Sequence, residues 1–416
     1  MPDLDLDDEL ARLRDGVRET LPVPDFDQVV GRHRQRVVRR RMQIGAVVSV
    51  LVVSLAVPLL REQMIPAPPS DAPPPAASTL PKGPFISGVN FADAEHGYAI
   101  RARCEGSPVS CSEVLLATDD GTRWDKRPLP RPESAPSWAR GRITALGADE
   151  LTLDWPLSPG SEGTRSYRVH SMDGGRTWDE VAVPGVVTET VPAIPERGAL
   201  LETCAELVGG GQKCAERTFA VVTPGSGESA LLANRPPLTA MAAGSEATLD
   251  GRWWVAGRDP QTDSWGLAVS DDDGRTWTTT ILDWAQSVDP YGWSVVSQGG
   301  ALYATAIGAL SNTSNGLQGI FRSVDGGRTW EQTWRPAEDK QPRRVFSSTV
   351  AGDDGRLTIN APDGMYLSRD GGRTFTKATQ RYPDYAGQSR TGYIAVSGTN
   401  VVVSADGVRW EKIKID

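Results

Sequence analysis

Histidine and cysteine are scarce in this chain of 416 residues, which contains three histidines and four cysteines. None of the histidines, His33, His96 and His170, stands at a spacing typical of a metal motif, so no metal site is predicted. The chain also has neither a phosphate-binding glycine loop nor a nucleophile elbow. It therefore carries no signature of a nucleotide-dependent enzyme or an α/β-hydrolase, and no cofactor is expected.

Positive charge is also in deficit, because the formal net charge is −9. Residues 1–42 hold nine arginines and nine acidic residues, and residues 43–60 hold no charge. The rest of the chain therefore carries the whole excess of negative charge. An acidic main domain argues against nucleic acid as a partner.

One long uncharged run, Ile44–Leu60, interrupts an otherwise polar N-terminal region. As a helix it would be roughly 25 Å long at about 1.5 Å per residue, close to the thickness of a bilayer core. Six arginines between Arg32 and Arg41 precede it, which favours a cytoplasmic N-terminus and an exported remainder. We expect residues 43–60 to be a transmembrane signal anchor, with a cleaved signal peptide as the alternative.

The segments that flank this run are predicted to be appendages. In residues 1–42, apolar side chains at helical spacing predict a cytoplasmic helical tail. The tail either docks a cytoplasmic partner or stays solvated while its arginines set the topology. Residues 61–84 contain eight prolines and few hydrophobic residues, which predicts an extended stalk.

An eight-residue pattern, which we call the repeat turn, recurs through the rest of the chain. Its fullest copy is Ser323–Trp330, S-V-D-G-G-R-T-W, and each copy stands between two strand-like runs. Asp-Gly between such runs indicates a tight hairpin, because glycine accepts positive φ and aspartate can accept hydrogen bonds from the turn. The six copies place their aspartates at Asp120, Asp173, Asp272, Asp325, Asp370 and Asp406.

The repeat turn resembles the Asp box, the bacterial neuraminidase repeat of sialidases, sortilin-type receptors and a photosystem assembly factor. The resemblance covers the scaffold, residues 85–416, and implies a β-propeller with the boxes at its periphery, away from any active site. It does not extend to the sialidase catalytic residues. The Arg-Ile-Pro stretch that precedes the first box in those enzymes has no counterpart here, where that region holds only Arg101 and Arg103.

The spacing of the repeat turns predicts the number of blades. Units of roughly 45–50 residues, each with four strands, are typical of propellers. The interval from Trp178 to Trp277 is nearly double its neighbours, and within it Pro224–Glu228 looks like a repeat turn that has lost its Asp and Trp. Counting that unit gives an all-β, seven-bladed propeller, with six blades as the alternative. The last blade is short, so we expect its remaining strand to come either from 381–390 or from the start of the propeller.

The four cysteines form two close pairs, each between the second and third strands of its unit. Short spacings and an even number after an export segment predict disulfides, Cys104–Cys111 and Cys204–Cys214.

Loops on the face opposite the repeat turns are the candidate binding site. Aromatic residues, arginines and carboxylates gather in these loops, as a site for a sugar or peptide requires, although each tryptophan could equally pack between blades. The candidate ligand-binding residues are Trp138, Trp284, Tyr291, Trp293, Arg343, Arg344, Tyr382 and Tyr385.

No catalytic residue can be assigned from the sequence. Asp154, Asp283, Asp289 and Asp384 have no context that would single out a glycosidase pair. We therefore predict a membrane-anchored, extracytoplasmic module that binds or helps to assemble a cell-envelope glycan or protein without catalysis. The alternative is an exo-glycosidase of the sialidase type.

Overall fold

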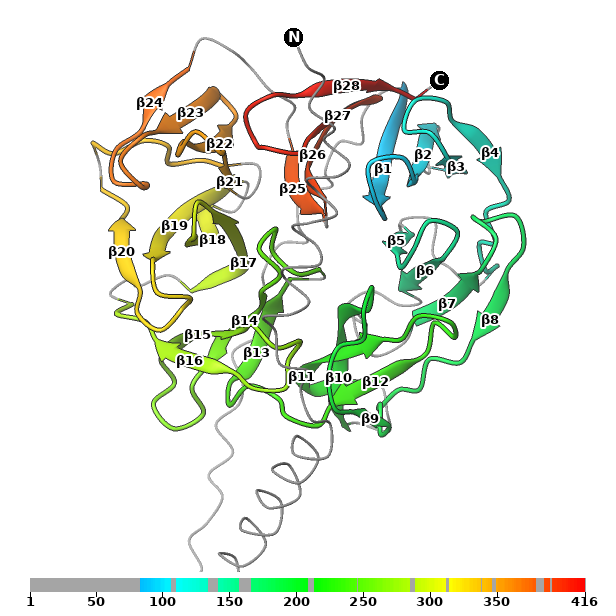
Figure 1. Cartoon of the computed structure of the whole chain (residues 1–416), viewed down its shortest axis with the longest axis horizontal. Coiled ribbons are helices and arrows are strands. Elements are labelled where there is room, and N and C mark those ends of the chain that lie inside the picture. The colour runs from blue at the N-terminus through cyan, green and yellow to red at the C-terminus, as the bar shows by residue number, and fades with distance from the viewer. Residues whose placement is uncertain are drawn as a thin grey trace, which may run out of the picture. The chain divides into compact units, whose positions relative to one another are not determined.

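The structure, a computed structural model, describes residues 83–105, 110–133, 141–156, 166–208, 213–244, 246–284, 289–311, 314–337, 339–345, 349–378, 385–389 and 391–415. These residues form seven four-stranded sheets arranged as the blades of a β-propeller (Figure 1). The prediction of an all-β, seven-bladed propeller is confirmed. No helix long and apolar enough to span a membrane occurs within these ranges. The predicted tail (1–42), anchor (43–60) and nearly all of the stalk (61–84) lie outside them.

Blade 1 contains β1 (Gly83–Phe91), β2 (Gly97–Glu105), β3 (Ser110–Thr118) and β4 (Asp125–Arg127), and blade 2 contains β5 (Arg142–Ala145), β6 (Leu151–Pro156), β7 (Ser166–Ser171) and β8 (Asp179–Val181). Blade 3 contains β9 (Thr190–Val191), β10 (Ala199–Val208), β11 (Lys213–Val222) and β12 (Ser229–Leu232), and blade 4 contains β13 (Thr239–Ala243), β14 (Trp253–Arg258), β15 (Trp265–Ser270) and β16 (Thr278–Ile281). Blade 5 contains β17 (Pro290–Gln298), β18 (Ala301–Ser311), β19 (Ser314–Ser323) and β20 (Glu331–Trp334). Blade 6 contains β21 (Val350–Ala351), β22 (Leu357–Ala361), β23 (Gly364–Ser368) and β24 (Thr376–Lys377), and blade 7 contains β25 (Tyr385–Ser389), β26 (Gly392–Ser397), β27 (Asn400–Ser404) and β28 (Glu411–Lys414).

The repeat turns join the third and fourth strands of six blades, and their side chains satisfy the turn backbone. In blade 5 the Asp325 carboxylate accepts hydrogen bonds from the Thr329 N–H (2.9 Å) and hydroxyl (2.7 Å). The Ser323 hydroxyl donates to Asp325 and accepts from the Gly327 N–H, both at 2.8 Å. Gly327 has a φ of +89°, and a Cβ there would lie 2.7 Å from Val269 of blade 4. The turn therefore needs glycine both for its backbone and for packing against the next blade.

Substituting Ser323 by alanine is expected to lower the free energy of unfolding by about 1–3 kcal/mol, because the buried Gly327 N–H loses its acceptor. Urea-induced unfolding of the full-length chain measures this. The neighbouring Val324 is exposed, so Val324→Ala should change stability by less than about 0.5 kcal/mol. Equal effects of the two substitutions would contradict the structural role of the serine.

Blade 3, which lacks an intact repeat turn, also has a different strand order. Its sheet runs β10-β11-β12-β9, so the first strand of the unit lies at the sheet edge beside β12 and pairs with it in parallel. The Pro224–Glu228 turn joins β11 and β12, as expected for a degenerate repeat. Its Gly225 N–H is 2.5 Å from the carboxylate of Glu150, which comes from blade 2. An acidic side chain from the neighbouring blade thus provides an acceptor for this turn, which has no aspartate of its own.

The ring closes without an exchanged strand among the described residues. Blade 7 takes its strands from 385–414 and blade 1 from 83–127, so the remaining strand of blade 7 comes from the 381–390 region. The seam is held by a hydrogen bond from Ile86 N–H to Gly398 O (2.8 Å) and by an apolar cluster from both blades. That cluster includes Ile86, Phe91, Leu116, Ile394, Val401 and Ile413.

The β13–β14 connection of blade 4 reaches across the propeller axis. Glu246 accepts a hydrogen bond from the Asn90 amide of blade 1 (2.8 Å), and Ala247 O accepts one from Gln388 of blade 7 (3.0 Å). Blade 4 lies opposite the seam in a seven-bladed ring, so these contacts cross the centre (Figure 1). They tie both sides of the seam to the far blade.

The first predicted disulfide is confirmed. Cys104 and Cys111 are bonded and occupy paired positions on β2 and β3. Cys204 is also disulfide-bonded. The side chain of Cys214 lies outside the described ones, so the second pairing stays a prediction.

Candidate binding surface

The two faces of the propeller differ in what they carry. In the six regular blades, the first-to-second and third-to-fourth connections share one face, and the latter are the repeat turns. The second-to-third connections and the links between blades share the opposite face. The candidate ligand residues were predicted for this opposite face.

Two of the candidate residues, Trp284 and Trp293, belong to an aromatic cluster between blades 4 and 5. Trp293 is 8% exposed, and its ring centroid lies 5.7 Å from Trp265 and 5.8 Å from Trp284. Trp284 is partly buried and stacks on Phe321 with centroids 6.1 Å apart. Both tryptophans thus pack in the core, the alternative that the sequence left open for each tryptophan.

The other described candidates are exposed and lie along the edge of blade 5. Tyr291, at the start of β17, is 56% exposed. Arg343 and Arg344 are also exposed, and the backbone of Arg344 forms an isolated β-bridge with Gly316 of β19. Between them, on β18, Leu310 is 38% exposed. Pro290 pairs with Gly308, Gly308 pairs with Gly316, and Gly316 bridges to Arg344, so the backbone segments that carry these residues lie side by side. We call Tyr291, Leu310, Arg343 and Arg344, each next to or within two residues of these positions, the blade-5 row.

The two arginines of the blade-5 row have no acidic partner among the described residues. Neither Arg343 nor Arg344 makes an ion pair with another described residue. Burial raises the pKa of Tyr291, so its hydroxyl is protonated at neutral pH. The row therefore contains an aromatic ring, an aliphatic side chain and two guanidinium groups without ion pairs to described residues. Leu310 was missed by the sequence analysis, because nothing in an apolar strand marks the residue that will lie at its exposed end.

Three further candidates lie wholly or partly outside the described residues. Trp138 and Tyr382 lie outside them, and only the backbone of Tyr385 is described, at the start of β25.

The aspartates considered for glycosidase chemistry are engaged by arginines in separate places. Asp154 is buried and pairs with Arg168 at 2.7 Å in blade 2. Asp283 pairs with Arg335 at 3.2 Å, and Asp289 pairs with Arg258 at 2.5 Å. Asp384 lies outside the described residues. The described carboxylates of this set therefore do not face one another across a common site.

One group of described side chains has the composition of a metal site. Ligand atoms of Asp93, Glu95 and His96 lie within 4.8 Å of one another in the β1–β2 turn. The Asp93 carboxylate accepts hydrogen bonds from the N–H groups of Glu95 (3.0 Å) and His96 (2.7 Å). Burial opposes ionisation of Asp93, but these bonds and the His96 ring lower its pKa. The group thus stabilises its own turn.

Comparison with known proteins gives similarities of fold alone. No family model matches the chain, and no curated protein sequence matches it. The structure of YCF48 bound to D1 peptide is similar with a TM-score of 0.47 and 13% identity, over 81% of this chain and 95% of that one. The GH74 enzyme of Niastella koreensis gives 0.43 and 14%, over 79% of this chain and 54% of that one. The Trypanosoma rangeli sialidase gives 0.33 and 12%, over 80% and 54%. This chain spans about half the length of the last two.

Proposed function

We propose that this chain is a membrane-anchored, extracytoplasmic Asp-box propeller that binds a cell-envelope glycan or protein without catalysis, as a recognition or assembly module. The observation that carries the proposal is the blade-5 row, where an exposed tyrosine and leucine adjoin two arginines without ion pairs to described residues. Aromatic and arginine side chains dominate the energetics of recognition surfaces. On an acidic protein, two neighbouring cations without ion pairs to described residues favour an acidic partner.

The Cys104–Cys111 disulfide supports the exported location. Disulfides persist in oxidising compartments and are rare where thiols are kept reduced. This agrees with the orientation expected from the arginines before residues 43–60, which would leave the propeller outside the cytoplasm.

Photocrosslinking in living cells tests the blade-5 row. A photoreactive phenylalanine analogue at Tyr291 is expected to give a discrete adduct with a glycan or protein of the cell envelope. The matched control is the same analogue at Met172, which is also 56% exposed but lies in a repeat turn on the opposite face. Equal labelling at the two positions, or none at Tyr291, would refute the proposal.

The contribution of charge can then be measured with the analogue at Leu310. Replacing Arg343 and Arg344 together by alanine should reduce the adduct about tenfold, because two surface charges contribute roughly 1–2 kcal/mol to binding an acidic group. Arg328→Ala, an exposed arginine of a repeat turn on the other face, should leave the adduct unchanged. An adduct that persists in the double variant would show that the arginines are not part of the binding surface.

A further inference from the structure

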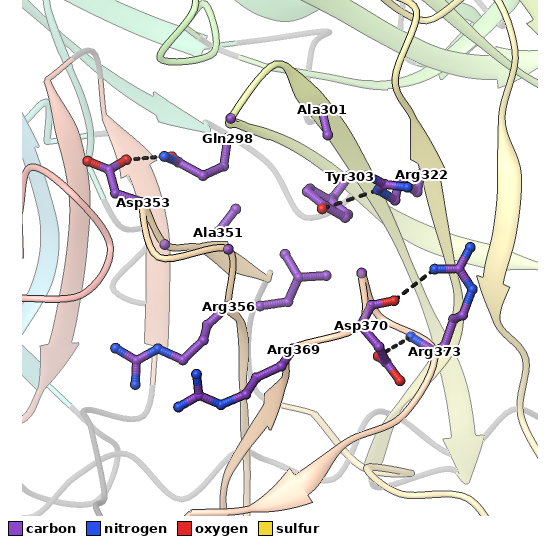
Figure 2. A pocket seen from close by; sticks show the side chains of 15 residues that line it. Gln298, Ala301, Tyr303, Arg322, Ala351, Asp353, Arg356, Arg369, Asp370 and Arg373 are labelled. Atoms are coloured by element: carbon purple, nitrogen blue, oxygen red, sulfur yellow. Dashed lines mark hydrogen bonds between the residues drawn. The ribbon is translucent and has the colours of Figure 1, made fainter.

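A cavity of about 390 Å³ lies between blades 5 and 6, on the face that carries the repeat turns (Figure 2). The β17–β18 turn, the β21–β22 turn and the repeat turn of blade 6 form its walls. Its charged lining consists of four arginines and two aspartates, a formal charge of +2 in a chain whose net charge is −9. The arginines are Arg322, Arg356, Arg369 and Arg373, and the aspartates are Asp353 and Asp370.

Two of these arginines are already engaged by acidic residues. Arg373 donates to Asp370 O at 2.8 Å and to the Glu331 carboxylate at 2.7 Å. Arg356 pairs through Nε with Asp354. Both therefore belong mainly to the walls of the cavity.

The other two have no carboxylate partner among the described residues. Arg322 lies with its guanidinium 6.0 Å from the centroid of the Tyr303 ring, and its Nε donates to the Tyr303 hydroxyl at 3.3 Å. Arg369 is exposed and makes no ion pair with any described residue. In Figure 2 the guanidinium groups of Arg356 and Arg369 extend toward the same side of the cavity.

The aspartates of the lining make no ion pair with these two arginines. Asp370 accepts hydrogen bonds from the Ser368 hydroxyl (2.7 Å) and the Thr374 hydroxyl (2.6 Å). Although burial opposes it, these bonds lower the pKa of Asp370 to about 2, so the carboxylate is charged but occupied by its own turn. The Asp353 carboxylate accepts from the Gln298 amide.

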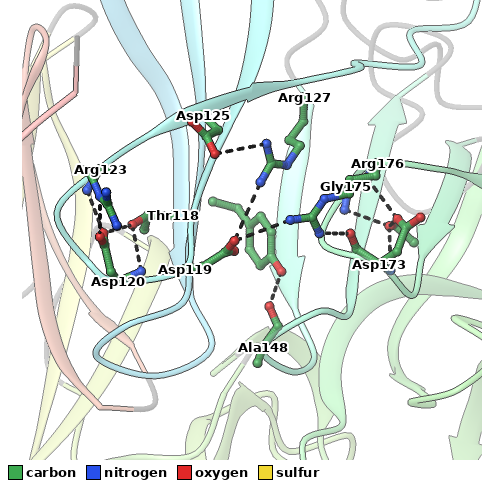
Figure 3. A network of polar contacts seen from close by, with 12 residues as sticks. Thr118, Asp119, Asp120, Arg123, Asp125, Arg127, Ala148, Asp173, Gly175 and Arg176 are labelled. Atoms are coloured by element: carbon green, nitrogen blue, oxygen red, sulfur yellow. Dashed lines mark hydrogen bonds and ion pairs between the residues drawn. The ribbon is translucent and has the colours of Figure 1, made fainter.

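The junction of blades 1 and 2 shows how the same turns are built without excess positive charge (Figure 3). There Asp119 Oδ2 lies 3.4 Å from Arg176 and 3.8 Å from Arg127. Tyr98, which corresponds to Tyr303, donates to Ala148 O of the next blade at 2.5 Å. The Asp119 carboxylate thus offsets the charge of the two arginines, and the Tyr98 hydroxyl links the two blades.

Aligning the repeat turns shows what has changed between blades 5 and 6. The position of Asp119 is taken by Val324, that of Met172 by Arg369, and that of Ala117 by Arg322. At these three positions one acid is lost and two arginines are gained, and Arg127 is replaced by Thr333, while the turns keep the same hydrogen bonds. The added charge is therefore not needed to form the junction, and uncompensated guanidinium groups in a recess are suited to a ligand.

We propose that this cavity is a second binding site, separate from the blade-5 row, and that it takes an oxyanion group carried by a small ligand. Guanidinium groups bind carboxylate and phosphate oxygens through paired hydrogen bonds. The volume lies near the lower end of the range of roughly 300–1,000 Å³ for small-molecule sites, which fits a ligand the size of an acidic or phosphorylated monosaccharide. Tyr303 lines the same cavity, so a sugar ring held there would adjoin an aromatic side chain.

Calorimetric titration of the purified full-length chain tests this site with three probes: glucose 6-phosphate, glucuronate and glucose. Saturable binding of either acid, with none of neutral glucose, is expected, and the tighter acid identifies the oxyanion. Binding of glucose equal to that of the acids would overturn the proposal, as would no saturable binding of either acid.

Substitutions that copy residues of the blade 1–2 junction make the test specific. Arg369→Met copies Met172 and should weaken acid binding about tenfold. Val324→Asp copies Asp119 and should also weaken acid binding, because it adds a negative charge opposite Arg373, the counterpart of Arg176, without removing an arginine. Arg328→Met is the control, because Arg328 is an exposed repeat-turn arginine outside the cavity lining. Equal weakening by all three would indicate unspecific attraction and contradict the site.

Discussion

Replacing Arg168 by methionine is expected to lower the free energy of unfolding by about 3–5 kcal/mol. Arg168 and Asp154 are each 4% exposed, and the Arg168 Nε lies 2.7 Å from Asp154 Oδ1. The guanidinium also donates to Ser229 Oγ (2.6 Å) and Gly227 O (3.1 Å), which belong to blade 3. Removing it leaves a buried carboxylate without compensation and frees two acceptors at the blade 2–3 interface.

Urea-induced unfolding of the full-length chain measures the loss. Arg176→Met removes an exposed arginine of the same blade and should cost less than about 1 kcal/mol. The double variant Asp154→Leu with Arg168→Met should recover part of the stability, because no uncompensated charge remains. A loss below about 1 kcal/mol for Arg168→Met alone would show that the pair does not hold the two blades together.

The same interface explains why blade 3 keeps its place without an intact repeat turn. The buried Glu150 carboxylate contacts both the Gly225 N–H and the His170 ring (3.0 Å), and Arg168 holds the other end of the turn. Blade 2 thus contributes hydrogen bonds at both ends of the turn, while the Gly227 N–H donates to Thr223 O within the turn itself. Blade 3 is also the blade whose first strand, β9, lies at the sheet edge and pairs in parallel with β12.

Most of the fold could be predicted from the sequence, because the repeat turn is a local device. Its Asp, Gly and Thr interact within five residues of one another, so the pattern reports the hairpin directly. The order of strands in blade 3 could not be predicted in this way. It depends on which partner residues 190–191 meet, and hydrophobic alternation is the same at either edge of a sheet.

The candidate site was predicted less well, and a β-bulge shows why. Tyr291 and Trp293 are two residues apart, so in a regular strand their side chains would share a face. The register of β17 against β18 shifts between Pro290 and Gly292, and the bulge redirects Tyr291 to solvent while Trp293 packs in the core. A bulge depends on the pairing of two strands, which a single-strand pattern does not contain.

Acidification from pH 4 to pH 2 is expected to unfold the propeller through its repeat turns. Hydrogen bonds from the Thr329 N–H and hydroxyl lower the pKa of Asp325 to about 2, and those from Thr177 do the same for Asp173. Asp370 also has a pKa of about 2, and the pKa values of the remaining three repeat aspartates are shifted in the same direction. Six carboxylates therefore favour the folded state as long as they are ionised.

The sign follows from linkage between protonation and folding. The folded pKa values lie below the ordinary aspartate value of 3.8, so this stabilisation is complete above about pH 4 and is lost as the pH falls toward 2. The melting temperature should fall steeply within this window. Asp325→Asn should melt lower than the wild type at pH 7, where the wild-type carboxylate is ionised, and the difference should shrink by pH 2, where the wild-type carboxylate is losing its charge. A melting temperature that stays constant between pH 4 and pH 2, or a difference that persists undiminished at pH 2, would show that the repeat aspartates do not stabilise the fold through their charge.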